Sequence, residues 1–483
     1  MYLGIDLGTS GVKALLIDGS QKALASGHAA LDVSRPHAGW SEQDPAQWIA
    51  AINEAIGALK RSNPVQLAAV KGIGLSGHMH GATLVDSEDN VLRPCILWND
   101  TRSHAEAAEL DSDPRFRKIT GNIVFPGFTA PKLVWVARHE ADIFKRVAKV
   151  LLPKDYLRLW LTGEHISEMS DSAGTSWLNV AERRWSQELL EATGLEESQM
   201  PALVEGTQQG GTLRKELAAG WGMGPNVVVA GGAGDNAASA VGMGTVKPGQ
   251  AFVSIGTSGV LFAANGSYLP NAESAVHTFC HALPDVWHQM GVILSASDSL
   301  TWLGGITGKK PEELTAELGD KLKAPGRVTF LPYLSGERTP HNDAAIRGVF
   351  TGLAHQSGRT ALTQAVLEGV AFAFRDSLEA LRTAGTELHR VTAIGGGSRS
   401  RYWLKSIATA LNLPVDVPAD GDFGAAFGAA RLGLISAQKA DPATVLTPPK
   451  TAETIEPDAG LTEAYGDAYR RYSALYPAIK GGT

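Results

Sequence analysis

The sequence predicts an α/β protein built from two similar halves. Strand-like and helix-like segments alternate along both halves of the 483-residue chain. The pentapeptide Gly-Thr-Ser-Gly-Val occurs at 8–12 and again at 256–260, and each copy lies between two strand-like runs. The chain is also longer than one hydrophobic core normally supports. We therefore expect domains at residues 1–244 and 245–483, with the boundary in a Gly-rich stretch.

The first half shows the periodicity of both kinds of element. Within Lys132–His139, Leu133 and Val136 recur at helical spacing. Asp44 stands before Pro45, which is a usual start signal for a helix. We expect strands at Leu3–Leu7, Lys13–Asp18, Val70–Ser76, Ala82–Asp86, Lys149–Leu152 and Val227–Ala230. We expect helices at Ala46–Lys60, Thr101–Glu109, Lys132–His139, Lys154–Leu161 and Glu188–Thr193.

The second half repeats this scheme. We expect strands at Ala251–Ile255, Val260–Ala263, Thr329–Leu331 and Val391–Ile394, and helices at Asp298–Leu303, Leu362–Ala384, Tyr402–Leu411 and Phe423–Leu432. The stretch Ser436–Pro457 is rich in Pro, Thr and Ala, which predicts an extended connector. Tyr465, Tyr469, Tyr472 and Tyr476 recur at spacings of four, three and four, so they form one face of a final helix that docks against the body of the protein.

Composition narrows the class of function. Hydrophobic residues make up 44% and charged residues 19%, as in an ordinary folded protein. The net charge of −7 argues against nucleic acid or an anionic membrane as a partner. Only Cys95 and Cys280 are present, so we expect a reducing compartment and no disulfide framework. Since we find neither a signal-peptide pattern nor an apolar run of about 18 residues, we expect a soluble, cytoplasmic protein, with a homodimer as the default assembly.

The repeated turn carries the first chemical signal. Glycines let backbone N–H groups approach an anion closely, and Thr and Ser hydroxyls add donors. Asp6 ends the strand before the first turn, where a carboxylate beside phosphates suits Mg²⁺. Two such turns, one per half, would grip a polyphosphate from both sides; the alternative is a polar surface turn repeated by coincidence. The candidate phosphate-binding residues are Gly8, Thr9, Ser10, Lys13, Gly256, Thr257 and Ser258.

Two other Gly-rich turns carry candidate ligand residues. Asp235 and Asn236 follow a strand and a Gly-rich turn, and strand ends that face a crevice are where α/β proteins bind ligands. From the residues alone, Asp235 is equally well explained as an ordinary helix cap. The turn Gly395–Ser398 lies between a strand and a helix, where it would accommodate adenine and ribose or form a tight, capped turn.

Several common motifs are missing or stand in the wrong context. A Gly-x-Gly-x-x-Gly pattern begins at Gly72, but a strand rather than a helix follows it, which argues against a dinucleotide site. No segment matches the phosphate-binding Walker A pattern. No Cys/His cluster has metal-ligand spacing, which argues against a zinc site.

Taken together, the motifs of this chain resemble those of the FGGY carbohydrate kinases. The motifs are Asp6-x-Gly-Thr-Ser, the second Gly-Thr-Ser, Gly395-Gly-Gly-Ser398 and Gly127-x-Thr-x-x-Lys132-Leu-x-Trp135, and they span most of the chain. The resemblance implies the actin-like and hexokinase-like ATPase fold, in which two α/β domains face each other across a cleft. It also implies that residues 1–244 bind the sugar and phosphates and that residues 245–483 bind ATP.

Within the family, four segments are most similar to the bacterial xylulokinases. They are Gly77–Gly81, Trp98–Arg102, Leu152–Tyr156 and Leu331–Pro340. His78 departs from the Gln of many xylulokinases, and Ala361 replaces a polar residue. The similarity implies phosphate transfer from ATP, with Mg²⁺, to the C5 hydroxyl of D-xylulose. The alternatives are a kinase for ribulose, gluconate or glycerol, or a non-enzymatic actin-like ATPase such as a filament protein or chaperone.

The resemblance also implies roles for individual residues toward a small-molecule sugar. It implies that Asp235 takes the proton from the sugar hydroxyl and that Asp6, the second catalytic candidate, positions Mg²⁺. Met79, His80 and Asn236 would hold the sugar, although His80 taken alone is more often a core histidine. The residues that would hold adenine are Gly396, Gly397 and Ser398. We assign no role to Trp98, Asp100, Arg102, Glu337 or Arg338.

Overall fold

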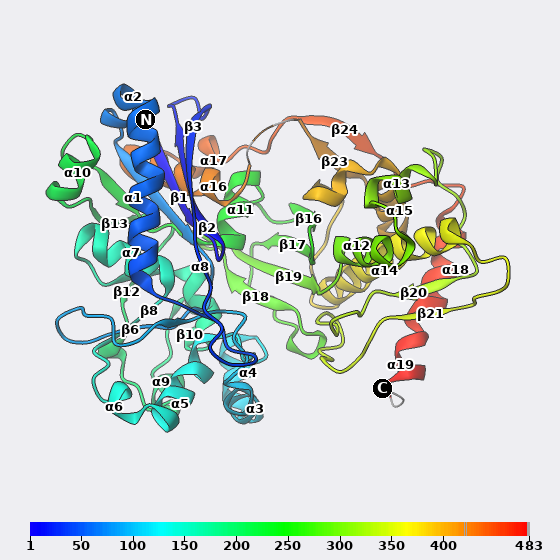
Figure 1. Ribbon diagram of the computed structural model, residues 1–483, viewed down its shortest axis with the longest axis horizontal. Helices are drawn as coiled ribbons and strands as arrows, with labels where there is room; N and C mark the ends of the chain where they lie inside the picture. The colour runs from blue at the N-terminus through cyan, green and yellow to red at the C-terminus, as the bar shows by residue number, and fades with distance from the viewer. Residues whose placement is uncertain (420, 422, 481–483) are drawn as a thin grey trace. The chain divides into compact units, whose positions relative to one another are not determined.

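The computed structural model describes residues 1–419, 421 and 423–480 (Figure 1). The chain forms two compact units, and each unit draws on separate stretches of the sequence. Unit 1 contains Met1–Val246, Phe279–Trp287 and Asp422–Pro448. Unit 2 contains Lys247–Thr278, His288–Gly421 and Pro449–Thr483. The division into continuous domains, 1–244 and 245–483, stays a prediction.

Unit 1 is built on a mixed sheet. Strand β1 (Tyr2–Leu7) pairs with β2 (Gly11–Ile17) in antiparallel register and with β5 (Gly72–Gly77) in parallel register. Over the described residues the sheet has seven strands, in the order β13-β14-β5-β1-β2-β3, with β15 also paired to β5. The remaining members are β3 (Ala23–Ala30), β13 (Gln209–Thr212), β14 (Val228–Ala230) and β15 (Ala233–Gly234).

Unit 2 contributes to a second mixed sheet. Strand β16 (Ala251–Ile255) pairs with β17 (Gly259–Asn265) in antiparallel register and with β22 (Val391–Ile394) in parallel register. In the part of the chain that the structure describes, this sheet also has seven strands, in the order β18-β19-β17-β16-β22-β23-β24. The remaining members are β18 (His277–Cys280), β19 (Trp287–Ile293), β23 (Val415–Pro418) and β24 (Thr451–Ile455).

The two sheets repeat one strand order. The series β2-β1-β5-β14 in the first sheet corresponds to β17-β16-β22-β23 in the second, with the last three strands parallel in both. Each copy of Gly-Thr-Ser-Gly-Val forms the turn of the antiparallel hairpin in this series. The predicted α/β fold of two duplicated halves is therefore confirmed.

Helices and short strands complete the two units. In unit 1 the helices are α1 (Pro45–Ser62), α2 (Pro64–Ala68), α3 (His104–Ser112), α4 (Pro114–Thr120), α5 (Thr129–His139), α6 (Ala141–Phe144), α7 (Pro153–Thr162), α8 (Met169–Ser172), α9 (Gln187–Ala192), α10 (Lys215–Trp221), α11 (Asp235–Met243), α16 (Ala425–Gln438) and α17 (Pro442–Val445). In unit 2 they are α12 (Ser297–Thr307), α13 (Pro311–Ala316), α14 (Arg359–Thr383), α15 (Arg401–Leu411), α18 (Thr462–Ser473) and α19 (Leu475–Ile479). The short strands are β4 (Glu42–Gln43), β6 (Thr83–Val85), β7 (Cys95–Ile96), β8 (Lys149–Leu151), β9 (Ile166–Glu168), β10 (Leu178–Asn179), β11 (Arg184–Trp185), β12 (Ala202–Val204), β20 (Thr329–Leu331) and β21 (Val349–Thr351). Among the described residues, no helix combines the length and the apolar character that a membrane crossing requires.

Two expected elements need correction. The helix predicted at Thr101–Glu109 begins only at His104, because the Asp100 carboxylate accepts the backbone N–H of Arg102 at 2.9 Å and holds a turn there. The predicted connector Ser436–Pro457 is also wrong, because α16, α17 and β24 all lie partly or wholly inside it. Strand β24 pairs with β23, and such pairing between distant segments leaves no local signal in a Pro- and Thr-rich sequence.

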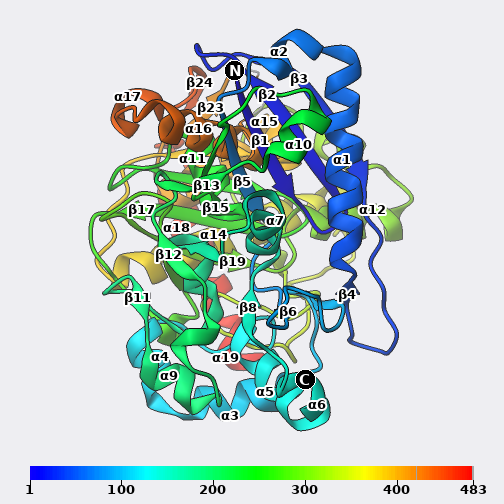
Figure 2. The same ribbon diagram turned by 90° about the vertical axis from the view of Figure 1, so that its left-hand side faces the viewer.

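Glycines let helix α16 pack directly on the sheet of unit 1 (Figures 1 and 2). A Cβ atom at Gly4 would lie 1.8 Å from the Ala426 carbonyl oxygen, and one at Gly74 would lie 1.8 Å from the Ala429 oxygen. Real Cβ atoms do not approach that closely, so only glycine fits at these positions. The Gly-x-Gly-x-x-Gly segment therefore serves helix–sheet packing.

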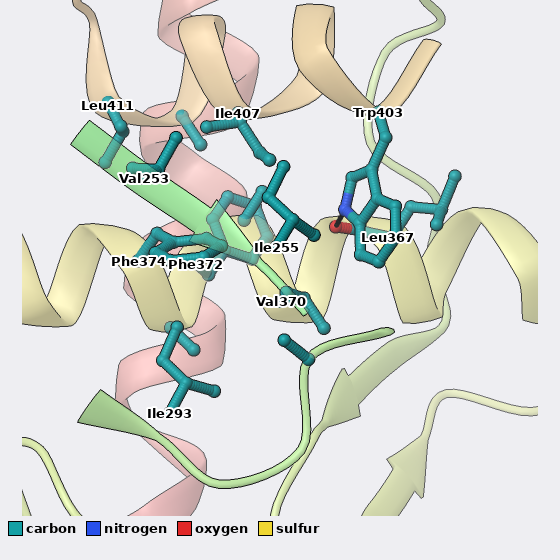
Figure 3. Packing of buried hydrophobic residues seen from close by; sticks show 14 of the residues in the cluster. Val253, Ile255, Ile293, Leu367, Val370, Phe372, Phe374, Trp403, Ile407 and Leu411 are labelled. Carbon is teal, nitrogen blue, oxygen red and sulfur yellow. Dashed lines mark hydrogen bonds between the residues drawn. The ribbon is translucent and has the colours of Figure 1, made fainter. Parts of the chain in front are cut away.

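The core of unit 2 lies between β16 and the helices α14 and α15. Figure 3 shows Ile255 of β16 between Val370 of α14 and Ile407 of α15. Trp403 of α15 is 1% exposed, and its indole Nε1 donates to the Leu367 carbonyl at 3.1 Å. This hydrogen bond fixes the orientation of a large ring whose other edge faces a cavity described below.

Tyr465, Tyr469 and Tyr472 of α18 pack within unit 2, as the predicted docking requires, but Tyr476 lies in the separate helix α19, so the four tyrosines do not share one helix as predicted. Tyr465 and Tyr472 are 0% exposed. The hydroxyls of Tyr472 and Tyr333 lie 3.2 Å apart, and Tyr469 donates to the Asp376 carboxylate at 2.7 Å. Buried hydroxyls that find partners make this docking directional as well as apolar.

Candidate active site

Three neighbouring strands of unit 1 bring the candidate carboxylates to one edge of the sheet. Strands β1 and β15 both run parallel to β5, on either side of it. Asp6 of β1 lies opposite Ser76, and Gly234 of β15 lies opposite Gly77, directly before Asp235. Asp6 and Asp235 therefore flank the carboxyl end of β5, which is where α/β proteins bind ligands.

Asp235 is the first residue of α11, and Gly234 is the N-cap of that helix. The alternative that Asp235 caps the helix is therefore wrong. Its Oδ1 accepts hydrogen bonds from the backbone N–H and the side-chain Nδ2 of Asn236, at 2.7 and 2.9 Å. Burial and the neighbouring charge of Asp6 raise the pKa of the Asp235 carboxyl to about 7, against the lowering effect of Asn236. A carboxyl with this pKa takes up a proton readily near neutral pH.

The turn formed by the first Gly-Thr-Ser-Gly-Val copy is held by hydrogen bonds from Gln43 and Trp98. The backbone N–H of Gly8 donates to the Gly11 carbonyl at 2.9 Å and closes the turn. Gln43 Nε2 donates to the Thr9 carbonyl at 2.8 Å, and Trp98 Nε1 donates to the Thr9 hydroxyl at 2.9 Å. Thr9 is thus oriented through both its backbone and its side chain.

Lys13 lies next to the carboxylate that is the candidate Mg²⁺ ligand. In the β1–β2 pairing Lys13 stands directly opposite Asp6. Directly opposite residues have Cβ atoms about 4.5–5.5 Å apart and share a face of the sheet. The strand pairing therefore places a cation and a carboxylate at the mouth of the same turn.

The second pentapeptide forms a turn of different length. Leu7 pairs with Val12 and leaves four residues in the first turn, whereas Ile255 pairs with Gly259 and leaves three in the second. Both expected hairpins are present, but their turns are not identical. A shift of one residue in register sends the following side chains to opposite faces.

The start of helix α12 holds the second turn. The Gly256 carbonyl accepts the backbone N–H of Ser297 at 2.9 Å and its hydroxyl at 2.6 Å. The Thr257 carbonyl accepts the backbone N–H of Ala296 at 2.8 Å. The carbonyl groups thus point to α12, while the side chains of Thr257 and Ser258 are exposed.

Met79 and His80 follow the carboxyl end of β5 after one intervening residue, His78. His80 has a left-handed backbone conformation, with φ of 70°. Its ring is stacked on Phe128 with 4.6 Å between centroids, and its Nδ1 lies 2.8 Å from the Gly174 carbonyl oxygen. Met79 is 5% exposed and lies against Gly234, where an added Cβ would be 3.0 Å from its sulfur. Both residues therefore belong to the same strand-end region as Asp235.

The turn at Gly395 borders a cavity in unit 2. The cavity has a volume of about 390 Å³, and Gly396 and Gly397 line it together with Leu300 and Trp403. The rest of the lining is mixed: Pro311 is apolar, whereas Glu312 and Arg399 are charged and Ser297, Thr301, Thr315 and Ser400 carry hydroxyls. Apolar side chains beside a few polar groups are typical of sites that bind a small molecule such as an aromatic base. Because β16 and β22 are parallel neighbours, this turn and the second pentapeptide lie at the same edge of the sheet.

Two serines stabilise the turn itself. The Ser398 hydroxyl donates to the Gly395 carbonyl at 2.7 Å. Ser400 is the N-cap of α15 and accepts the backbone N–H of Trp403 at 3.3 Å. Ser398 is not among the residues that line the cavity, so its hydroxyl acts on the turn.

The five residues to which we assigned no role from the sequence mostly form ion pairs or are buried. Arg102 forms an ion pair with Asp100 at 2.6 Å and with Glu42 at 2.7 Å, and its guanidinium lies 3.6 Å from the Trp40 ring centroid. Burial raises the pKa of the Glu337 carboxyl to about 8. The Arg102 contacts brace loops of unit 1, whereas Trp98 contacts a candidate ligand residue, since its Nε1 donates to the Thr9 hydroxyl.

Comparisons with known proteins identify the family. The model of the FGGY family of carbohydrate kinases, N-terminal domain, matches residues 1–242, and that of the C-terminal domain matches residues 251–437. The chain belongs to the FGGY family of carbohydrate kinases. It is 50% identical to the "Xylulose kinase" of Escherichia coli (strain K12), over 99% of this chain and 96% of that protein.

Solved structures of FGGY kinases agree with this assignment. A protein described as a "xyloylose kinase" from Brucella ovis is 71% identical, with a TM-score of 0.98 and 99% of both chains covered. The xylulose kinase of Rhodospirillum rubrum is 30% identical, with a TM-score of 0.93 and 99% of both chains covered. The chain is thus a sugar kinase phosphotransferase, and FGGY kinases use ATP with Mg²⁺.

The residues of this FGGY kinase fit both cofactors. No group of three or more His, Cys, Asp or Glu side chains is arranged to hold a metal ion in the described part of the chain. Mg²⁺ is bound in proteins through one or two carboxylates together with substrate phosphates. Asp6 would supply such a carboxylate, and the cavity over Gly396 and Gly397 would accept the base of ATP.

One FGGY motif has a positioning role that we did not foresee. In Gly127-x-Thr129-x-x-Lys132, Lys132 is 0% exposed and its Nζ donates to the carbonyls of His80 and Gly127, at 2.8 and 2.7 Å. The Thr129 hydroxyl also donates to the His80 carbonyl, at 3.2 Å. Burial lowers the pKa of Lys132 to about 7. The sequence signal was present in the motif, but only the fold connects it to His80.

Proposed function

We propose that this kinase phosphorylates D-xylulose to D-xylulose 5-phosphate with Mg·ATP. The observation that carries the proposal is the likeness to proteins named xylulose kinase, at 50% identity over nearly the whole chain. The Gly77–Gly81 segment, which resembles that of the xylulokinases, lies beside Asp235 in unit 1. The kinase activity itself follows from the family.

In this proposal Asp235 acts as the general base. Its carboxylate takes the proton of the C5 hydroxyl as the oxygen bonds to the γ-phosphorus of ATP, and ADP leaves. Asn236 keeps one Asp235 oxygen in place through its hydrogen bonds and presents its own amide to a neighbouring sugar hydroxyl. Met79 and His80 hold the sugar beside this carboxylate.

We propose nucleotide-binding residues in each of the two units. In unit 1 the residues are Gly8, Thr9, Ser10 and Lys13 for phosphate and Asp6 for Mg²⁺. In unit 2 they are Gly256, Thr257 and Ser258 for phosphate and Gly396 and Gly397 for adenine, with Ser398 holding the turn that carries these two glycines. When bound, Mg²⁺ neutralises part of the phosphate charge. Residues 1–244 thus carry the sugar chemistry and residues 245–483 most of the ATP contacts.

We also propose that the enzyme is cytoplasmic and forms a homodimer. The two cysteines, Cys95 and Cys280, are free and buried, which supports a reducing compartment. A dimer with twofold symmetry is the most frequent assembly among soluble oligomers. Sedimentation of the purified protein at several concentrations tests the dimer, and a single monomeric species would contradict it.

A coupled ADP assay tests the substrate. The purified protein is given Mg·ATP with D-xylulose, D-ribulose, D-gluconate or glycerol, and without any sugar. We expect D-xylulose to raise the rate of ADP formation far more than the other compounds do. If another acceptor has a higher kcat/KM than D-xylulose, that compound is the substrate instead. If none of the four compounds stimulates ADP formation, the proposal is rejected.

A further inference from the structure

A fully buried charged cluster lies behind the proposed site in unit 1, and the proposed chemistry does not use it. Lys154 of α7 is 0% exposed, and its Nζ lies 2.7 Å from Asp155, 3.3 Å from Glu168 and 3.1 Å from Asp171. All three carboxylates are also 0% exposed. Buried charges are costly unless they are paired, and here the Lys154 ammonium pairs with all three carboxylates, although the Asp171 oxygens accept no hydrogen bond from the described residues.

The cluster reaches the turn that carries Asp235 through Ser170. The Ser170 hydroxyl donates to Glu168 Oε2 at 2.8 Å and accepts the backbone N–H of Gly234 at 3.1 Å. Gly234 is the N-cap of α11, so this bond holds the Ala233–Gly234 peptide, one residue before Asp235. Arg158 acts on the other end of the same turn, where it donates to the Ala230 carbonyl at 2.7 Å.

The segment that carries Ser170 continues to His80. Four residues further on, the Gly174 carbonyl lies 2.8 Å from His80 Nδ1. A carbonyl oxygen only accepts, so Nδ1 carries the proton. A Cβ atom on Gly174 would lie 2.3 Å from the Cε1 atom of His80, so this approach requires glycine. The backbone φ of Gly174 is not positive, so an alanine there would not strain the backbone. The substitution would therefore act on the imidazole of His80.

We infer that Ser170 and Gly174, four residues apart on one segment, are positioning residues: Ser170 holds the turn that carries Asp235, and Gly174 holds His80. The inference rests on the proposed roles of Asp235 and His80. A single short segment, anchored by the cluster around Lys154, thus positions both the proposed general base, Asp235, and the proposed sugar ligand, His80. Ser170 and Gly174 touch neither substrate nor cofactor in this arrangement, and they act through the residues that do.

The Ser170 contact is tested with a matched pair of variants. Ser170 and Ser172 are both 0% exposed in α8, but the Ser172 hydroxyl bonds to Ser167, at 2.8 Å, and makes no bond to the Asp235 turn. Ser170→Ala should lower kcat by about tenfold, the rate equivalent of one hydrogen bond, with little change in sugar KM. Ser172→Ala should have the same melting temperature as Ser170→Ala but keep the kcat of the parent protein. Equal kcat values in the two variants would overturn the inference.

The Gly174 contact is tested by the opposite kinetic pattern. Gly174→Ala should raise the sugar KM by about tenfold with a smaller effect on kcat, because it displaces the His80 ring. Gly220→Ala is the control, since an added Cβ there meets no atom within 4 Å. A sugar KM like that of Gly220→Ala would overturn the inference for His80. If Gly174→Ala does not fold, nitrogen NMR of the parent protein can show which ring nitrogen of His80 carries the proton. A proton on Nε2 alone at neutral pH would overturn the inference for His80.

One readout does not depend on the substrate. Amide hydrogen exchange of a peptide that spans Gly234 should be faster in Ser170→Ala than in Ser172→Ala, whatever sugar the enzyme uses. Equal exchange rates would reject the positioning role. If D-xylulose fails in the coupled assay but exchange differs as expected, the substrate assignment alone is wrong.

Discussion

Asp6 and Asp235 stand at the carboxyl ends of two strands that flank β5, and burial together with the Asp6 charge raises the pKa of Asp235 to about 7. Two carboxylates held at one sheet edge repel each other unless a proton or a cation lies near them. In the proposed mechanism, Mg²⁺ and the proton of the sugar hydroxyl are the two positive charges that this arrangement accepts.

Removal of the Asp6 carboxylate should weaken the use of Mg²⁺. We expect Asp6→Asn to raise the Mg²⁺ concentration for half-maximal rate by on the order of tenfold or more, as loss of a metal-binding group does. The measurement is ADP formation with D-xylulose as a function of free Mg²⁺. Asp32→Asn, which removes an exposed carboxylate from the same unit, is the control. A Mg²⁺ dependence like that of the parent would show that Asp6 has another role.

A side chain at Gly396 should block the nucleotide cavity. A Cβ at this position meets no atom within 4 Å, and the residue lines the cavity of about 390 Å³. We expect Gly396→Val to raise the KM for ATP by about tenfold, which corresponds to about 1.4 kcal/mol, and to leave the sugar KM unchanged. Gly305→Val is the matched control, because a Cβ there also meets no atom. If both variants bind ATP equally well, the base lies elsewhere.

The hydroxyl of Tyr472 should stabilise unit 2 without affecting catalysis. Tyr472 is 0% exposed, and its hydroxyl lies 3.2 Å from that of Tyr333. Tyr472→Phe should lower the free energy of unfolding by about 1 kcal/mol, the net value of one buried hydrogen bond. Urea denaturation measures the loss, and kcat should stay unchanged. An unchanged stability would mean that the hydroxyl pair contributes nothing to the docking of α18.

The carboxyl group of Glu368 should make stability depend on pH. Burial raises the pKa of Glu368 from 4.5 to about 8, against the hydrogen bonds from Gln364 and the backbone of Gly326. Between these values the folded state holds a proton that the unfolded state has lost, so stability falls as pH rises from about 4.5 to 8. Glu368→Gln should therefore gain melting temperature relative to the parent at pH 8 but not at pH 5. A pH-independent difference between the two proteins would contradict the assignment.

Much of this architecture follows from local sequence patterns. The two hairpins could be predicted because each Gly-Thr-Ser-Gly-Val turn lies between apolar runs that alternate in the usual way for strands. Asp235 could be placed at a strand end because Val227–Ala230 and a Gly-rich turn precede it. The family motifs then supplied the roles that spacing alone left open.

Other features depend on contacts between distant segments. Strand β19 was not expected, because buried polar residues interrupt its apolar pattern: His288 and Gln289 are 1% and 0% exposed, and Gln289 bonds to Asn265. Lys154 and Asp155 are charged residues at the start of the helix predicted at Lys154–Leu161, and both are fully buried. Their partners come from β9 and α8, and no local rule predicts such pairing.

The proposed mechanism is tested most directly by turnover of Asp235→Ala. With D-xylulose and Mg·ATP, kcat should fall by on the order of 10²–10⁴-fold, the usual contribution of a positioned general base. Circular dichroism and D-xylulose binding by calorimetry establish that the variant is folded and still binds the sugar. A folded Asp235→Ala protein that turns over at nearly the parent rate would show that this carboxylate does not take the proton.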